Sequence, residues 1–473
     1  MVIPHVNLKI LCNKSDSYGV ACTVEYRFFY ASTVTGCILA LPPRSRVSTV
    51  CEERLIKMPE HPAVPKVRIR EGKEKQLIRR HPWVFSGAID GKKGTLFPAE
   101  PAVVKVETSA GEFIAYGWYD PQSHIPIHLM SWDQQIFPDI SWWVQTISAA
   151  VQRRFVLFAQ PHVTAFRLIH GEADFLPGLT VDRYGSMLVC IISARVAWDH
   201  RIVVVQTLQR LVNPACIVVS TDEAFCGIEH LKVQSEWYIG GECVDRPADP
   251  ALQEAIFLEH GIAYTIHLGE GQKSGFYCDQ RENRLRLAQY VSGKQVLDAF
   301  SYTGGFSLHA LVAGAQHVTA LDSSASALET LGKQLTLNIE RGIIPPESKN
   351  RISLIKGDVF AYLREMESEI YDCIVLDPPK LAQTKGQVEG ALRAYKDLNR
   401  LAMLKIRKGG VIATFSCSGG VSREQLRTVL AWAAKDAGRE VQILETLGQP
   451  VDHPIRLSFP ESEYLKGFIF TVL

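Results

Sequence analysis

The sequence predicts an α/β protein of several domains: a parallel sheet covered by helices in the C-terminal part, an α+β region before it, and a small β-rich module before that. Strand-like apolar runs alternate with helical stretches from Gln295 onward, and repeated βα units require a parallel sheet with helices on both faces. Residues 166–268 give strands on either side of one helix, which is typical of an α+β unit. A chain of 473 residues is also too long for one ordinary domain.

The composition describes a globular protein without a strong overall charge. Hydrophobic residues make up 47% and charged residues 21%, which argues against disorder or low complexity. The net charge is 51 − 50 = +1, so any affinity for nucleic acid must come from local patches. The eleven cysteines include no C-x-x-C pair, which argues against a metal site or a disulfide scaffold and indicates a reduced, cytoplasmic protein. No apolar run approaches the length of a membrane span.

Residues 1–57 differ from the rest of the chain. They show no helical or strand periodicity and precede Met58-Pro59. We interpret them as an unstructured leader, or as the result of a start codon chosen too far upstream. Between Lys66 and Arg80 seven basic residues face two acidic ones, a local excess of 7 − 2 = +5. This stretch is either a solvated helix face or a patch that contacts phosphates.

A β-rich module is predicted over 64–142. The run 102–120 predicts a hairpin with its turn at Ala110-Gly111, and it carries several aromatic side chains. Aromatic residues next to a basic stretch are typical of an RNA-binding domain. A helix over 142–159 then leads into the α+β domain, predicted over 143–268. Within that domain Asp182–Gly185 is predicted to be a hairpin turn without a catalytic role.

The third domain, predicted over 269–473, repeats a strand-helix unit. Its strands are expected at 296–300, 318–322, 352–358, 371–377 and 411–416, with a last strand within 463–473. Ligands of such sheets bind outside the carboxyl ends of the strands. The residues at those ends are therefore the candidates for a functional site.

The first three strands end in residues suited to a nucleoside ligand. Two glycines in Ser301–Phe306 allow a close approach of the backbone, but the loop is not G-x-G-x-x-G. It therefore favours a ligand with a carboxylate, a ribose and an adenine over a dinucleotide. Asp322 lies 322 − 304 = 18 residues after Gly304, where an acid can meet ribose hydroxyls, and Asp358 is suited to the adenine amine. Each aspartate alone is also typical of a helix cap.

The fourth strand ends in Asp377-Pro378-Pro379-Lys380. Two prolines fix the backbone and make a rigid rim around a flat base. Enzymes that methylate exocyclic amines carry an aromatic residue after a related motif, whereas Lys380 and Leu381 follow here. That difference argues against amine methylation.

The fifth strand leads into Cys417, which is flanked by serines and glycines. Methylation at carbon 5 of a pyrimidine needs a thiolate to add at carbon 6, and Cys417 is placed for that role. The N-terminus of the following helix would lower the pKa of the thiol. The cysteines in apolar runs, such as Cys190 and Cys373, are interpreted as core residues.

The chain from about Lys66 to Leu473 resembles the class I S-adenosylmethionine-dependent methyltransferases that form 5-methylcytosine in large-subunit ribosomal RNA. The motifs that carry this resemblance are RRHPWVFSGAI, FLPGLTVDRYG, SGFYCDQRENR, FSYTGGFSLHAL, DPPK, YKDLN, TFSCSG, DHP and YLKGF. It implies a PUA-like RNA-binding domain, an α+β middle domain and a Rossmann-like methyltransferase domain. Residues 1–57 have no counterpart in the pattern.

The resemblance also implies roles for individual residues. Phe276, Asp279 and Arg281 would help to close the cofactor pocket. The other positions implied to hold S-adenosylmethionine are Asp298, Phe300, Thr303 and Gly304 in the glycine loop, Asp322 at the ribose and Asp358 at the adenine. Cys417 would be the covalent nucleophile, and Asp377 would bridge cofactor and target base. Asp377 is the first candidate for the base that removes the proton from carbon 5, with His453 second.

Two alternatives remain open from the sequence. One keeps the fold and the cofactor but methylates a guanine nitrogen, which needs no thiol. The other is a PUA-type RNA-binding or ribosome assembly protein without catalysis, although the predicted cofactor residues are all present. The expected partner is large-subunit ribosomal RNA, reached by flipping out the target base, and no membrane or metal is expected. A homodimer is one option for the oligomeric state.

Overall fold

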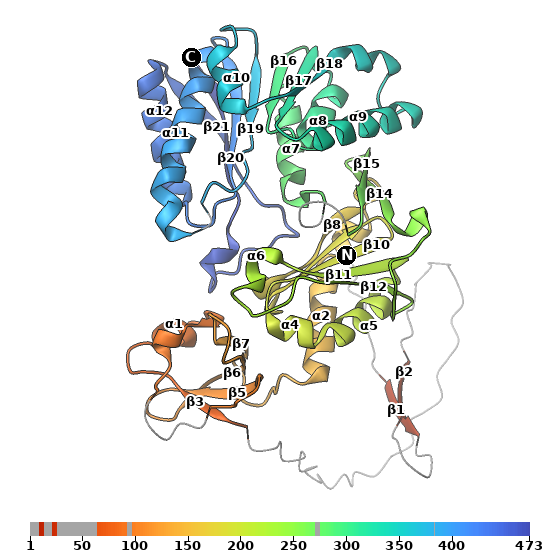
Figure 1. Ribbon diagram of the computed structural model, residues 1–473, viewed down its shortest axis with the longest axis vertical. Helices are drawn as coiled ribbons and strands as arrows, with labels where there is room; N and C mark the ends of the chain where they lie inside the picture. The colour runs from red at the N-terminus through yellow and green to blue at the C-terminus, as the bar shows by residue number, and fades with distance from the viewer. Residues whose placement is uncertain (1–8, 14–20, 26–63, 92–96, 270–274, 383) are drawn as a thin grey trace, which may run out of the picture. The chain divides into compact units, whose positions relative to one another are not determined.

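The computed structural model describes residues 9–13, 21–25, 64–91, 97–269, 275–382 and 384–473 (Figure 1). The chain divides into one unit up to His61 and a second from Pro62 onward. In the first unit β1 (Lys9–Asn13) and β2 (Ala21–Glu25) pair in antiparallel orientation. The rest of the predicted leader lies outside the described residues.

A five-stranded sheet forms the β-rich module, with the strand order β3-β5-β6-β7-β4. Its elements are β3 (Lys66–Arg68), α1 (Lys75–Ile78), β4 (Trp83–Val84), β5 (Ala102–Glu107), β6 (Phe113–Tyr119) and β7 (Ile127–Ser131). β5 and β6 form the predicted hairpin, and Gly111 takes a positive φ of +89° in its turn. The basic stretch 66–80 is a strand, a turn and one helical turn rather than a helix, and all seven of its cationic residues are exposed.

The middle domain is built on a six-stranded sheet with the order β13-β12-β11-β10-β9-β8. Its strands are β8 (Ala165–His170), β9 (Leu179–Tyr184), β10 (Met187–Ile192), β11 (Cys216–Thr221), β12 (Ser235–Ile239) and β13 (Glu242–Val244). Its helices are α2 (Ile140–Gln152), α3 (Phe155–Phe158), α4 (Arg195–Asp199), α5 (Arg201–Val212) and α6 (Glu223–Cys226). A separate hairpin of β14 (Glu254–Glu259) and β15 (Ile262–His267) follows this sheet.

The predicted turn at Asp182–Gly185 is wrong by several residues. Asp182 lies inside β9 and is 1% exposed, and the turn begins at Gly185. The physical reason is an ion pair: both carboxylate oxygens of Asp182 accept hydrogen bonds from Arg167 on β8, at 2.8 and 2.9 Å. A side chain that has a buried partner can stay in a strand, whereas the sequence shows only a polar residue next to a glycine.

The C-terminal domain contains the predicted parallel sheet, with the order β18-β17-β16-β19-β20-β22-β21. Its strands are β16 (Gln295–Ala299), β17 (His317–Asp322), β18 (Ile352–Lys356), β19 (Cys373–Leu376), β20 (Gly410–Ser416), β21 (Val441–Gly448) and β22 (Lys466–Val472). The first five are parallel, and β22 runs antiparallel to both of its neighbours. The sequence did not predict β21, a largely exposed strand at the edge of the sheet.

Helices cover both faces of this sheet, as two separate apolar clusters show. The helices are α7 (Arg281–Ala288), α8 (Gly305–Val312), α9 (Ala325–Glu340), α10 (Val359–Glu365), α11 (Val388–Lys405) and α12 (Arg423–Ala437). Side chains of α7, α8 and α9 pack on one face with Val296 of β16, and those of α10, α11 and α12 pack on the other with Leu297. Because neighbouring strand residues point to opposite faces, this division follows from the sequence pattern.

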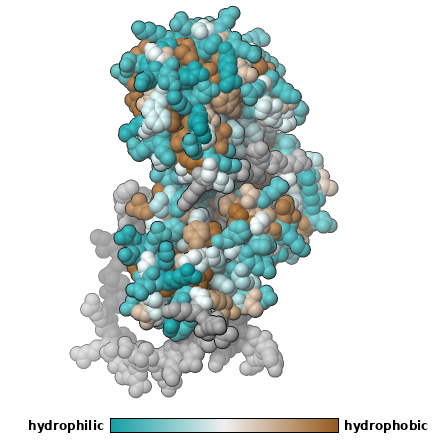
Figure 2. All heavy atoms as spheres, turned by 60° about the vertical axis from the view of Figure 1, so that its left-hand side comes forward, coloured by the Kyte–Doolittle hydropathy of each residue, from teal (hydrophilic) through white to brown (hydrophobic). Residues whose placement is uncertain are grey.

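The surface is mixed in polarity. Figure 2 shows hydrophobic residues as separate patches among hydrophilic ones on the face in view. Among the described residues no helix is both long and apolar enough to cross a membrane.

Candidate cofactor and catalytic site

The glycine loop between β16 and α8 has a backbone that few residues tolerate. Phe300, Tyr302 and Gly304 have φ values of +65°, +47° and +87°. A Cβ on Gly304 would lie 2.0 Å from Cδ1 of Leu331, so this position admits only glycine. Backbone strain of this kind concentrates at ligand-binding loops. Thr303, also expected at the cofactor, is buried in the same loop.

Two polar atoms near this loop are buried without a hydrogen-bond partner among the described residues. Oδ2 of Asp298 accepts a 2.6 Å hydrogen bond from Ser307, but its Oδ1 has no partner, and neither has Oγ of Ser301. Burial raises the pKa of Asp298 to about 6. Buried polar atoms are normally satisfied, so these two indicate a ligand that supplies donors. An acceptor and a hydroxyl beside a glycine loop fit the ammonium and carboxylate groups of S-adenosylmethionine.

Asp322 and Asp358 differ in what they hold. Asp322 ends β17, and its two oxygens accept hydrogen bonds from the backbone N–H groups of Tyr302 and Ser324, each at 2.8 Å. It therefore fastens the glycine loop to the next strand and remains half-buried at the site. Asp358 is exposed and caps α10 through a 2.8 Å bond from the N–H of Ala361. The cap interpretation is thus correct for Asp358, and its contact with adenine stays a prediction.

The three residues expected to close the cofactor pocket have partners within the protein, and their role at the cofactor stays a prediction. The ring of Phe276 packs in the core, 5.0 Å from that of Phe257. Arg281 is fully buried and pairs with both carboxylate oxygens of Asp452, at 2.8 and 3.0 Å. Asp279 accepts a 2.7 Å hydrogen bond from Tyr464, and its charge acts on Asp377.

The two predicted reacting residues lie at the ends of adjacent strands. Asp377 follows β19 and Cys417 follows β20, and these strands pair in parallel, so both residues are at the same edge of the sheet. Burial, with the nearby charge of Asp279, raises the pKa of Asp377 to about 7. Cys417 is half-buried, and Tyr277 and Tyr395 are among the groups affected by its charge. Leu381 is partly buried and packs against the core.

Arg284 and Lys466 border the site but were not predicted from the sequence. Arg284 is buried, and both oxygens of Glu259 accept hydrogen bonds from it at 2.8 Å. Its Nε lies 2.4 Å from where a Cβ on Gly305 would be, so it borders the glycine loop. Lys466, at the start of β22, donates a 3.0 Å hydrogen bond to the carbonyl of Ser418. Arg284 lies in SGFYCDQRENR and Lys466 in YLKGF. Their hydrogen-bond partners are 25 and 48 residues away, so the local sequence did not indicate these contacts.

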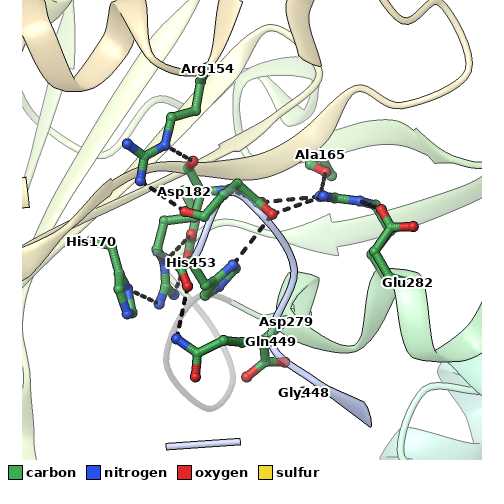
Figure 3. A network of polar contacts seen from close by, with 12 residues as sticks. Arg154, Ala165, His170, Asp182, Asp279, Glu282, Gly448, Gln449 and His453 are labelled. Carbon is green, nitrogen blue, oxygen red and sulfur yellow. Dashed lines mark hydrogen bonds and ion pairs between the residues drawn. The ribbon is translucent and has the colours of Figure 1, made fainter. Parts of the chain in front are cut away.

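A polar network ties the loop after β21 to the middle domain (Figure 3). Asp452 is its centre: its carboxylate pairs with Arg281, and Arg154 donates to its carbonyl at 2.9 Å. Arg167 joins through its backbone N–H, 2.8 Å from Oδ2 of Asp452. His453 is 1% exposed in this network, with Nδ1 3.5 Å from Asp452. A ring held in this way has little freedom to reach a substrate, which favours Asp377 as the base.

Comparisons with known proteins agree with the predicted fold class. A family model of PUA-like domains matches residues 67–132, and a model of S-adenosylmethionine-dependent methyltransferases matches residues 166–454. A solved structure described as a SAM-dependent methyltransferase from Streptococcus mutans is 20% identical, with a TM-score of 0.70 over 86% of this chain and 100% of that chain. Another, described as a methyltransferase complexed with SAH, is 21% identical with a TM-score of 0.71.

Curated relatives match over nearly their whole length. The ribosomal RNA large subunit methyltransferase I of Photobacterium profundum is 40% identical over 401 residues, which cover 84% of this chain and 97% of the relative. The protein of the same name from Erwinia tasmaniensis is 37% identical over 407 residues, covering 86% and 98%. The chain therefore belongs to the family of S-adenosylmethionine-dependent methyltransferases with an N-terminal PUA-like domain that includes ribosomal RNA large subunit methyltransferase I.

Proposed function

We propose that this enzyme methylates carbon 5 of a cytosine in large-subunit ribosomal RNA through a covalent adduct of Cys417 at carbon 6. The observation that carries the proposal is the juxtaposition of Cys417, after β20, with Asp377, after β19. A thiol beside a carboxyl group whose pKa is about 7 provides both a nucleophile and a base near neutral pH. The names of the relatives and the PUA-like domain support ribosomal RNA as the substrate, met in the cytoplasm.

The glycine loop and the aspartates after the strands would hold S-adenosylmethionine, which supplies the methyl group. Asp298 and Ser301 offer the unsatisfied atoms for its amino acid part, and Thr303 and Gly304 line the same loop. Asp322 is at the carboxyl end of β17, where it would meet the ribose, and Asp358 would lie on the adenine side. Phe300, with its positive φ, is the first strained residue of the glycine loop after β16 and would also lie at the cofactor.

The chemistry assigns one step to each reacting side chain. The thiolate of Cys417 forms a bond to carbon 6 of cytosine, and the electron pair of the carbon 5–carbon 6 double bond moves to carbon 5. Carbon 5 would then form a bond to the methyl group that S-adenosylmethionine supplies, and the bond from that methyl group to sulfur would break to leave S-adenosylhomocysteine. Asp377, ionised, accepts the proton from carbon 5, the double bond re-forms, and the bond between carbon 6 and Cys417 breaks to restore the thiolate. The target base must leave the RNA stack to reach both groups.

The exposed cations of residues 66–80 would bind the phosphates of the RNA. Seven of them occupy one short stretch of the PUA-like domain, and all are open to solvent. Their number explains how a chain with a net charge of +1 can bind RNA locally.

The deciding experiment incubates the purified chain with labelled S-adenosylmethionine and unmodified large-subunit rRNA, followed by mass spectrometry of the nucleosides. Wild type should give 5-methylcytidine, and Cys417→Ala should give none. Cys243→Ala, at an exposed cysteine on β13, is the matched control and should remain active. A methylguanosine that survives Cys417→Ala would replace the proposal with nitrogen methylation, and no product from wild type would favour a binding role.

A further inference from the structure

Lys466 is a buried lysine next to the predicted nucleophile. It starts β22 directly opposite Ser416, the last residue of β20, and Cys417 follows Ser416 in the chain. Its side chain is 3% exposed, and Nζ donates two hydrogen bonds of 3.0 Å to the carbonyls of Ser418 and Tyr464. The residues before and after Cys417 are therefore both held by Lys466: its backbone pairs with Ser416, and its side chain bonds to the carbonyl of Ser418.

Within the part of the chain that the structure describes, Lys466 forms no direct ion pair with a carboxylate. The carboxylate of Glu463 favours the ammonium form, but it already pairs with Arg423 at 2.9 Å. Burial lowers the pKa of Lys466 to about 8, so the ammonium form still predominates at neutral pH. Keeping a buried charge without a close counter-ion is costly, and such groups are frequent at functional sites.

The charged forms of Lys466 and Cys417 stabilise each other. The groups that act on Lys466 are Glu463, Cys417, Arg423 and Lys380. Those that share the surroundings of Cys417 are Tyr277, Tyr395, Lys466 and Asp377, and the carboxylate of Asp377 opposes a thiolate where the ammonium group of Lys466 favours it. In that set a negative charge on Cys417 stabilises the ammonium group of Lys466. By reciprocity, the ammonium group stabilises the thiolate.

The helix expected to activate Cys417 is less suited to the task. α12 begins only at Arg423, and its first turn is closed by a capping box in which Ser422 and Gln425 satisfy each other's backbone N–H groups. The free donors that would attract a thiolate are thus partly used within the helix itself.

We propose that Lys466 is a positioning residue for Cys417: its ammonium group favours the thiolate, and its two hydrogen bonds hold the turn that carries the sulfur. The thiol proton passes to solvent, and Lys466 keeps its own. The catalytic meaning of this arrangement rests on the function proposed above, but the effect on the thiol can be measured without catalysis.

The test is alkylation of the full chain by iodoacetamide between about pH 6 and about pH 9, because the thiolate is the form that reacts. Mass spectrometry of the Cys417 peptide gives the midpoint of the pH dependence, and the exposed Cys243 is the internal reference. Lys466→Gln keeps donors for the two carbonyls but removes the charge. It should raise the Cys417 midpoint by about one pH unit and slow alkylation near pH 7 about tenfold, with Cys243 unchanged.

Lys466→Arg keeps the charge and should keep the midpoint of wild type. Lys466→Met provides a second uncharged variant if Lys466→Gln does not fold, and Lys408→Met, in the exposed turn before β20, is a control for loss of any lysine. A midpoint that is the same in wild type and in the uncharged variants overturns the proposal, as does an equal shift in Lys466→Arg.

Failure of this inference can be told apart from failure of the proposed function. If Cys417→Ala still methylates RNA but the midpoint moves in Lys466→Gln, the lysine tunes a thiol that is not the nucleophile. If Cys417→Ala is inactive and the midpoint does not move, the nucleophile stands and the role of Lys466 is only structural.

Discussion

Two carboxyl groups of the site, on Asp298 and Asp377, have pKa values raised by burial to about 6 and about 7. Oδ2 of Asp298 accepts a hydrogen bond from Ser307, and its Oδ1 has no partner among the described residues, which suits a role in binding the cofactor. Asp377 is half-buried beside a second carboxylate, Asp279, and this environment brings its pKa to the range in which a general base works best.

Asp377→Asn is predicted to stop the reaction after methyl transfer. Without a base the proton stays on carbon 5, so the bond to Cys417 cannot break and the RNA remains attached. We expect turnover to fall by about 10²- to 10⁴-fold and a protein–RNA adduct to accumulate on a denaturing gel. In wild type the ionised fraction of Asp377 falls below about pH 7, so release of the adduct should slow as the pH is lowered. Normal product release by the variant would assign the base to another residue.

At this scale the sequence predicted the residue types better than their contacts. Cys417, Asp377 and Asp298 lie at the strand ends where the apolar runs stop, and such runs are visible in a sequence. The cofactor roles of Phe276 and Arg281 stay predictions, and the sequence did not reveal that Arg281 pairs with Asp452. That partner is 171 residues away, and no local pattern indicates a contact of such separation.

Among the structural elements, the glycine loop between β16 and α8 restricts most strongly which residue its backbone can accept. Gly304 combines a positive φ with a close approach to Leu331 of α9. Gly342 has a comparable φ of +68°, but no atom lies within 4 Å of the place where a Cβ would be. A substitution at Gly342 therefore measures the effect of the backbone conformation alone, without a steric clash.

Gly304→Ala is predicted to lose cofactor affinity, whereas Gly342→Ala should keep it. The added methyl group would lie 2.0 Å from Cδ1 of the buried Leu331, so this side chain or the loop must shift, and the positive φ strains the backbone in addition. We expect Kd for S-adenosylhomocysteine, measured by calorimetry, to rise by at least about tenfold, because a loop displacement removes more than one hydrogen bond. Gly342→Ala should lower the thermal midpoint slightly and leave Kd unchanged. Equal Kd values for Gly304→Ala and wild type would remove this loop from the binding site.

Element boundaries show why part of the fold escaped prediction. The strands β16, β17, β19 and β20 are mostly buried and appear as apolar runs, and the edge strand β18 is only partly buried but carries such a run as well. β21, at the other edge, is mostly exposed and was not recognised. α11 begins at Val388, and its first turns carry polar residues that the apolar pattern does not reveal. Exposed edge strands and the polar first turns of helices lack a clear apolar pattern, so they are hard to predict from the sequence although tertiary contacts stabilise them.

For the molecule as a whole, buried hydrogen bonds around an ion pair connect domains that are far apart in sequence. Asp452, in the methyltransferase domain, holds Arg281 by its carboxylate and meets Arg154 and Arg167 of the middle domain. Because Arg281 and Asp452 are both fully buried, loss of one partner leaves the other charge uncompensated.

Asp452→Asn is therefore predicted to destabilise the chain by about 3–5 kcal/mol, seen as a lower thermal midpoint. Asp436→Asn is the matched control: its ion pair with Lys396, at 2.6 Å, is exposed, so its loss should change the midpoint little. If the two variants melt alike, the buried network does not stabilise the link between the domains.

A second link joins the PUA-like domain to the middle domain through His128 on β7. The ring is buried between two carboxylates of the middle domain, with Nδ1 3.7 Å from Glu172 and Nε2 3.5 Å from Glu229. Glu229 also accepts a 2.8 Å hydrogen bond from Ser123. Burial alone would lower the pKa of His128, but the two carboxylates outweigh it and raise the pKa to about 9.

The stability from this link should depend on pH in a defined direction. A folded pKa above the ordinary 6.5 gives a contribution that is complete below about pH 6.5 and is lost as the pH rises through about 9, amounting to roughly 3 kcal/mol at most. His128→Gln should therefore melt several degrees below wild type near pH 6, and the two curves should converge near pH 10. Scanning calorimetry at both pH values measures this. A gap that is unchanged between them would mean that His128 stabilises the link by packing, with no contribution from its charge.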